Sequence, residues 1–233
     1  MLTPTNVLLF VAVFPPILLI AYVYRSDKIE KEPVSLLLKL VLYGMISILP
    51  AVIFEMVFEF LLKFVFPEGS TYFHLLDCFL VIALAEEGVK YFILKKWMWD
   101  HPHFNYRFDA IVYAVCIGLG FALAENILYV LAGGLTTGLI RAVTAIPAHA
   151  INAVFMGYYF GQAKRVEHMG HPASSRFFLN VALVLPIILH GFYDFCAMEG
   201  TPFFEKTFIG FVILMDVLAL FRIRKSSRED SPV

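Results

Sequence analysis

The sequence predicts an all-α, polytopic membrane protein of one domain, residues 1–233, from its apolar content, its few charges and the length of its apolar stretches. Apolar residues make up 60% of the chain, charged residues 16%, and the mean hydropathy is +0.79. Soluble domains contain about 45–50% apolar and about 25% charged residues, and disordered chains are more polar still. Both classes are therefore excluded. The net charge of −1 also gives no electrostatic basis for binding nucleic acid.

About seven apolar stretches are long enough to cross roughly 30 Å of hydrocarbon, which takes about 20 helical residues. Only short connectors separate them, without a repeat or a low-complexity linker, so we expect a single membrane domain. The charged connector 25–33 is expected to be a solvated turn at the membrane surface. The predicted spans are about 5–24, 36–62, 73–94, 109–131, 137–161, 177–197 and 203–221.

The distribution of basic residues predicts how the chain is oriented. If the N-terminus is outside the cell, thirteen Lys and Arg residues lie on the cytoplasmic side and three on the opposite side. The positive-inside rule then gives an N-out, C-in protein of the cell membrane. No basic residue precedes the first span and no cleavage site follows it, so we do not expect a removable signal peptide.

The third predicted span carries Glu86, Glu87 and Lys90. An ionisable group at bilayer depth costs at least about 2.5–3.5 kcal/mol, so it persists where it pairs, faces water or does chemistry. Lys90 follows Glu86 by four residues and Glu87 by three, which places all three side chains on one helical face. One carboxylate is expected to accept a proton from water while the lysine keeps the other anionic. A structural ion pair is the alternative.

Three further spans carry polar groups that fit the same chemistry. In the fourth, Phe121, Glu125 and Asn126 follow Gly118 and Gly120, whose small size lets a neighbouring helix approach. For Glu125 taken alone, a structural and a functional role remain open.

Each of the next two spans carries a histidine. In the fifth, His149 follows Pro147 and precedes Asn152 by one turn. In the sixth, Asp194 lies four residues after His190, so its carboxylate can orient the imidazole for catalysis or for metal binding. His149 could instead bond a backbone carbonyl. Counted along their helices, the acids and histidines fall in the middle or outer half of the membrane, so we expect them to meet in one cavity.

The order of these motifs resembles the PrsW family of intramembrane proteases, which is related to the CAAX prenyl endopeptidase and bacteriocin-processing superfamily. The motifs are E-E-x-x-K, F-x-x-x-E-N, P-x-H and H-x-x-x-D, on successive predicted helices. The segment YVYRSDKIEKEP is also similar to the end of that family's first helix, and the resemblance covers nearly the whole chain. It implies cleavage of a membrane-anchored protein near its extracytoplasmic side, for some members an anti-sigma factor in a signalling cascade.

The expected mechanism activates water within the bilayer. Glu86 or Glu87 is the predicted general base, and His149 and His190 would polarise the carbonyl or stabilise the oxyanion. A variant places zinc on His149, His190 and Glu125. The absence of H-E-x-x-H favours the metal-free route, with no cofactor required. The supporting residues are Lys90, Phe121, Asn126, Asn152 and Asp194.

Other classes are weaker on the residues alone. The leading alternative is a proton- or ion-coupled transporter, because buried Glu and His also mark proton paths, although the chain shows no inverted repeat. A heptahelical receptor would leave the cluster without a purpose, and two histidines could also ligate a b-type haem. A serine or cysteine protease lacks its motif: no G-x-S-x-G occurs, and Cys78, Cys116 and Cys196 are expected to be free and buried. The oligomeric state is not predicted.

Overall fold

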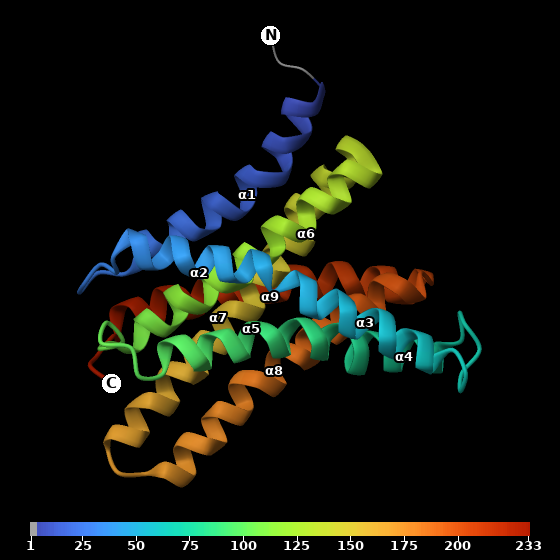
Figure 1. The fold of residues 1–233 in the computed structure, drawn as a ribbon. Coiled ribbons are helices and arrows are strands. Elements are labelled where there is room, and N and C mark those ends of the chain that lie inside the picture. Colours follow the sequence, from blue (N-terminus) through green and yellow to red (C-terminus); the bar gives the residue numbers. More distant parts are fainter. Residues whose placement is uncertain (1–3) are drawn as a thin grey trace.

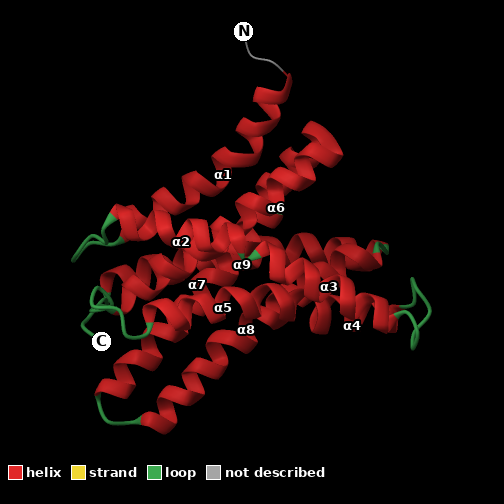
Figure 2. Ribbon diagram, in the orientation of Figure 1, coloured by secondary structure: helices red, strands yellow, loops and turns green. Residues whose placement is uncertain are grey.

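A computed structural model describes residues 4–233, and within them the chain is helical, with no strand (Figure 2). The predicted all-α class is confirmed. The elements are α1 (Pro4–Ser26), α2 (Val34–Ile46), α3 (Ile48–Leu62), α4 (Thr71–Leu76), the π-helical turn η1 (Asp77–Ile82), α5 (Ala83–Met98), α6 (Arg107–Val143), α7 (Ala145–His168), α8 (Pro172–Glu199) and α9 (Pro202–Arg228).

Every predicted span contains a helix, and three spans are subdivided. The stretch 137–161 breaks at Thr144, between the end of α6 and α7. The stretch 36–62 bends at Ser47 between α2 and α3, and the stretch 73–94 contains most of α4, all of η1 and part of α5. Four segments are long and apolar enough to cross a membrane: Asn6–Ser26, Val34–Leu62, Arg107–His168 and Pro172–Glu199. The protein is therefore a helical membrane protein. The count of seven spans and the N-out orientation stay predictions.

The long helix α6 reverses direction at Gly134. This residue has φ 76° and ψ −165°, a conformation open to glycine because it has no Cβ. Arg141 Nε lies 3.0 Å from Asn126 Oδ1, fifteen residues earlier, so the second limb of α6 runs back along the first. The reversal falls between the predicted spans 109–131 and 137–161, and it forms the hairpin beside the N-terminal half of α1 in Figure 1.

The first limb of α6 is the centre of the bundle. Residues 108–122 are buried along their whole length, with α1, α2 and α7 packed around them. The close helix crossings depend on small residues, as expected. A Cβ at Gly120 would overlap the Val41 carbonyl oxygen of α2, and one at Gly118 would lie 2.9 Å from the Ala153 side chain of α7. The three cysteines are free and buried, as predicted.

Three segments meet at one end of the molecule, which we call the C-terminal end: residues 27–33, 99–106 and 229–233. Asn105 Nδ2 donates to Glu30 Oε2 at 3.0 Å, and the Val233 amide donates to the Asn105 carbonyl at 3.0 Å. The opposite end carries the turns 63–70 and 200–201, and Figure 1 shows the two ends at the left and right.

The prediction that connector 25–33 is solvated is wrong for two of its acids. Asp27 and Glu32 are only 2% and 3% exposed, whereas Lys28, Glu30 and Lys31 are exposed. The connector folds back onto the start of α6, where the Tyr113 side chain meets Glu32. Charge pattern alone does not reveal a loop that packs on a neighbouring helix.

Candidate active site

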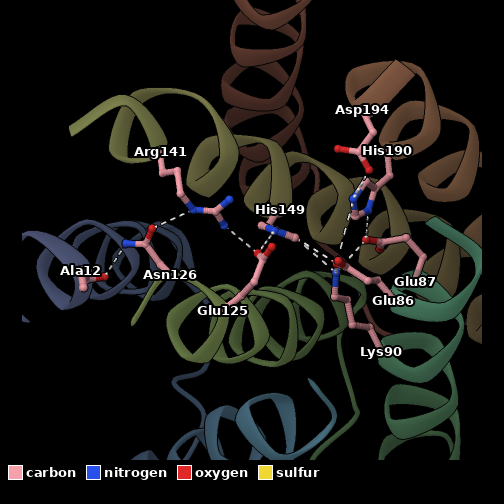
Figure 3. A network of polar contacts seen from close by, with 10 residues as sticks. All are labelled: Ala12, Glu86, Glu87, Lys90, Glu125, Asn126, Arg141, His149, His190 and Asp194. Carbon is pink, nitrogen blue, oxygen red and sulfur yellow. Dashed lines mark hydrogen bonds and ion pairs between the residues drawn. The ribbon is translucent and has the colours of Figure 1, made fainter. Parts of the chain in front are cut away.

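The side chains of Glu86, Glu87 and Lys90 form the centre of a buried polar network (Figure 3). Lys90 Nζ donates to Glu86 Oε2 at 2.9 Å and to Glu87 Oε1 at 2.8 Å. The spacing of three and four residues along α5 produces this arrangement, so the predicted shared face is confirmed. One ammonium thus compensates two adjacent carboxylates inside the bundle.

His149 of α7 joins this centre to α6. Its Nδ1 lies 3.2 Å from Lys90 Nζ, and its Nε2 lies 2.9 Å from Glu125 Oε2. Lys90 Nζ also lies 4.1 Å from the centre of the Phe121 ring, a cation–π distance, and that ring is 5.9 Å from the His149 ring. Both ring nitrogens of His149 are therefore already engaged by the protein.

His190 of α8 completes the network from the other side. Its Nδ1 lies 2.9 Å from Glu87 Oε1, and its Nε2 lies 3.2 Å from Asp194 Oδ2. The two imidazole rings are 5.5 Å apart and perpendicular, at an interplanar angle of 90°. Each nitrogen of His190 faces a carboxylate oxygen, so the ring is held in one orientation. The predicted Asp194 contact and the meeting of both histidines with the acids are confirmed.

Asn126, one of the predicted supporting residues, reaches the imidazole of His149 through two intervening side chains. In the described part of the chain it bonds neither imidazole: its Nδ2 donates to the Ala12 carbonyl and its Oδ1 accepts from Arg141 Nε, both at 3.0 Å. Arg141 Nη2 in turn lies 2.8 Å from Glu125 Oε2. Asn126 therefore orients Glu125 through Arg141.

Arg141 is a site residue that the sequence motifs did not indicate; it is one of the three basic residues counted on the non-cytoplasmic side. The sequence feature that could have indicated its role is the Gly133–Gly134 pair seven residues earlier. Two adjacent glycines allow the chain to fold back, so the basic residue after them can meet Glu125 before them. Asn152 is buried and lines the cavity described next.

A cavity of about 860 Å³ opens beside the network, with walls from α3 and from α5 to α9. Glu87 and Lys90, only 1% and 3% exposed, are buried behind that wall. The cavity is large enough for a peptide segment and several waters. The predicted site residues on its surface are Glu86, Phe121, Glu125, His149, Asn152, His190 and Asp194.

Four side chains of the network could hold a metal ion. Donor atoms of Glu86, Glu87, His149 and His190 all lie within 4.8 Å of one another. Imidazole and carboxylate ligands are those that catalytic zinc uses, so the donor set fits. The donor set includes Glu86 and Glu87 but not Glu125, whose carboxylate contacts His149 Nε2 and Arg141 Nη2.

The fold and this site together define a class of protein. A helical membrane protein that buries acids, a lysine and imidazoles beside a cavity with room for water has the groups needed for acid–base chemistry within the bilayer. These parts are those of an intramembrane enzyme.

Comparison with known proteins gives the family. Residues 32–221 match the sequence model described as "PrsW family intramembrane metalloprotease", and the chain belongs to this family. It is 36% identical over 187 residues to Protease PrsW of Geobacillus kaustophilus, covering 80% of this chain and 78% of that one. It is 32% identical over 220 residues to Protease PrsW of Oceanobacillus iheyensis, covering 94% and 96%. The Bacillus subtilis protein of that name is 32% identical over 219 residues, covering 93% of both. No solved structure gave a match.

Family membership confirms the resemblance drawn from the four motifs and makes the chain an enzyme, an intramembrane protease by class. It also argues against the transporter alternative.

Proposed function

We propose that the chain hydrolyses a peptide bond of a membrane-anchored protein in this cavity, with Glu86 as the general base. The observation that carries this proposal is the unequal placement of two adjacent carboxylates. Glu86 lines the cavity, whereas Glu87 is buried behind it and contacts Lys90 and His190. A water in the cavity can therefore meet Glu86 but not Glu87. Glu86 takes the proton of that water and later passes it to the leaving amine.

Glu87 and Lys90 then have a positioning role. The Lys90 ammonium offsets the negative charge of both acids, which would be costly to bury unpaired. Glu87 contacts His190 Nδ1 at 2.9 Å and fixes the imidazole plane. Both residues act on the reaction through the groups that they hold.

His190 is the better placed of the two imidazoles to stabilise the oxyanion. His190 Nε2 contacts Asp194 Oδ2 at 3.2 Å, a longer contact than the 2.9 Å from Nδ1 to Glu87 Oε1, so Nε2 is the nitrogen that a substrate oxygen can engage. His149 has both nitrogens engaged by Lys90 and Glu125. We therefore assign oxyanion stabilisation to His190 and an orienting role to His149.

The same residues bear on the question of zinc. A zinc ion would be held by Glu86, Glu87, His149 and His190, and when bound it would polarise the carbonyl and acidify water. Lys90 Nζ contacts three of those four side chains, which supports the metal-free route as the first choice.

We further propose seven spans in the N-out orientation in the cell membrane. His149 lies near the start of α7, and His190 lies in the second half of α8. Both are therefore closer to the end of the molecule that carries the turns 63–70 and 200–201. In the N-out orientation that half is extracytoplasmic. An anti-sigma factor anchored by one span is the substrate that the family resemblance suggests.

The proposal is tested with purified protein and a panel of single-span membrane proteins. Glu86→Gln should lower kcat/KM by about 100-fold or more, the range expected for a lost general base. Glu59→Gln is the matched control, because Glu59 lies on α3 and pairs with Lys63 at 2.9 Å. Full turnover by Glu86→Gln, or none by the unaltered protein on any of the panel, would contradict the proposal.

A further inference from the structure

Glu55 is a charged side chain on the cavity wall that the proposed mechanism does not use. Glu55 lies in the middle of α3 and lines the cavity together with Ile48 and Val52. The spacing of four and three residues puts all three on one helical face. Glu55 follows two apolar residues on this face, in a segment apolar enough to cross a membrane.

The Glu55 carboxylate has an unsatisfied oxygen. Within residues 4–233, its Oε1 is buried without a hydrogen-bond partner. One turn further along α3, Glu59 has a partner at 2.9 Å in Lys63. An uncompensated acid inside a membrane protein is costly and marks a functional position.

The charges around Glu55 do not compensate it. Its strongest charged neighbours are Glu86 and Glu125, which repel it, followed by His190 and Lys90. Lys90 is already bonded to Glu86 and Glu87, and His190 contacts Glu87 and Asp194.

The other base on the cavity wall is also engaged. Arg141 is paired with Glu125. Glu55 is therefore free to bind a cation that the chain does not supply.

We propose that Glu55 forms a subsite for a basic side chain, Lys or Arg, in the membrane segment of the substrate. Such a side chain has a long apolar stem, which suits the walls formed by Val52 and Ile82, and a charged head that the carboxylate can bind. Glu55 is then a specificity-determining residue. This inference rests on the proposed protease function.

The test uses synthetic single-span peptides that differ at one position in the outer third of the span. This position is Lys, Leu or Glu. Nanodiscs of phosphatidylglycerol alone contain no cationic headgroup, so lipid headgroups do not compete. Binding of the labelled peptides is measured by fluorescence anisotropy, and cleavage is followed separately. The position of the variable residue is scanned through the outer third.

At its best position, Lys should bind about 10-fold or more tightly than Leu, the factor expected for one charge-assisted hydrogen bond. Glu55→Gln should abolish this ratio and Glu55→Lys should reverse it in favour of the Glu peptide. Glu59→Gln should keep it. Thermal unfolding of each variant shows that it is folded, and the Glu55→Gln ratio suffices if Glu55→Lys does not fold.

Each outcome bears on one proposal. Equal binding of Lys and Leu peptides at every position, or a Lys preference that survives in Glu55→Gln, would overturn the subsite. Cleavage without charge preference would refute the subsite and leave the protease function standing. A Glu55-dependent preference without any cleavage would support the subsite and contradict the protease function. A preference seen only when amine-bearing phosphatidylethanolamine is absent would assign the subsite to a lipid headgroup and overturn the substrate assignment.

Discussion

Two of the regions that bury acids in this molecule have different surroundings. Around Lys90, the carboxylates of Glu86, Glu87 and Glu125 each contact a lysine or arginine within 3 Å. At the C-terminal end, Asp27 and Glu32 each keep one buried oxygen without a hydrogen-bond partner. The first region holds charge by pairing it.

The second region instead favours the protonated form. Burial raises the pKa of Glu32 to about 7, and the nearby Asp27 and Glu30 carboxylates act in the same direction. Burial likewise raises the pKa of Asp27. Burial alone therefore does not mark an acid of this protein as catalytic. The two regions differ in whether a lysine or arginine side chain contacts the buried carboxylate.

Removing the central base should have the largest effect. Lys90→Met leaves two adjacent carboxylates uncompensated, and breaking a buried ion pair in this way costs about 3–5 kcal/mol. We expect a markedly lower thermal midpoint in detergent, together with lost activity. Lys96→Met, an exposed lysine of the same helix, is the control. An unchanged midpoint for Lys90→Met would mean that Glu86 and Glu87 are not held as a charged pair.

Removing the base that holds Glu125 should have a smaller effect. Arg141→Gln breaks the contacts to Glu125 and Asn126, and a lost hydrogen bond to a charged group corresponds to about 1.5–3 kcal/mol. Because His149 depends on Glu125 for its orientation, kcat should fall more than KM changes. Lys206→Gln, exposed at the start of α9, serves for comparison. Kinetics identical to those of the unaltered protein would remove Arg141 from the site.

The buried acids Asp27 and Glu32 at the C-terminal end, which form no ion pair within residues 4–233, should make the stability of the fold depend on pH. Between about pH 4.5 and about pH 7, native Glu32 binds a proton that the unfolded chain has released, so stability falls as pH rises through this window. Glu32→Gln should flatten that slope and be more stable at pH 8 by about 1–3 kcal/mol. The measurement is the thermal midpoint from pH 4.5 to pH 8, with the exposed Glu30→Gln as control. Parallel curves for Glu32→Gln and the unaltered protein would show that Glu32 is charged in the fold.

The smallest effect is expected from metal removal. If Lys90 supplies the positive charge of the site, purified protein should contain less than one zinc per chain and keep its activity after prolonged chelation. Elemental analysis and assays before and after dialysis measure this. One zinc per chain, with activity restored only by re-adding metal, would establish the metal-dependent route through Glu86, Glu87, His149 and His190.

Contacts within one helix were the most predictable part of the site. The pairs Glu86–Lys90 and His190–Asp194 follow from the helical repeat, because residues four apart share a face. The helices themselves were predictable from apolar length. That the histidines would meet the acids followed from depth, since membrane spans lie side by side.

Contacts that depend on packing angles and turns were not predictable. Arg141 reaches Glu125 only because α6 reverses at Gly134, and Glu55 faces the cavity only because of the rotation of α3. Asp27 and Glu32 are buried by a loop that folds onto α6. In each case the partner is far along the chain, and the sequence gives no angle between the elements.

The π-helical turn η1 determines the angular phase of α5. Before it, α4 is fixed by the Ser70 cap and by His74 Nδ1, which lies 2.9 Å from Glu199 Oε1. A π-turn contains one residue more than an α-turn, and each residue rotates a helix by about 100°. The α4, η1 and α5 elements form one continuous helical rod, anchored at His74. Compared with an uninterrupted α-helix of the same length, the π-turn shifts the face that carries Glu86 and Lys90 by about one residue, or about 100°. Removing one residue from Asp77–Ile82 would leave an α-turn that completes the same rotation, so the anchor would stay in place and the acids would still face the histidines.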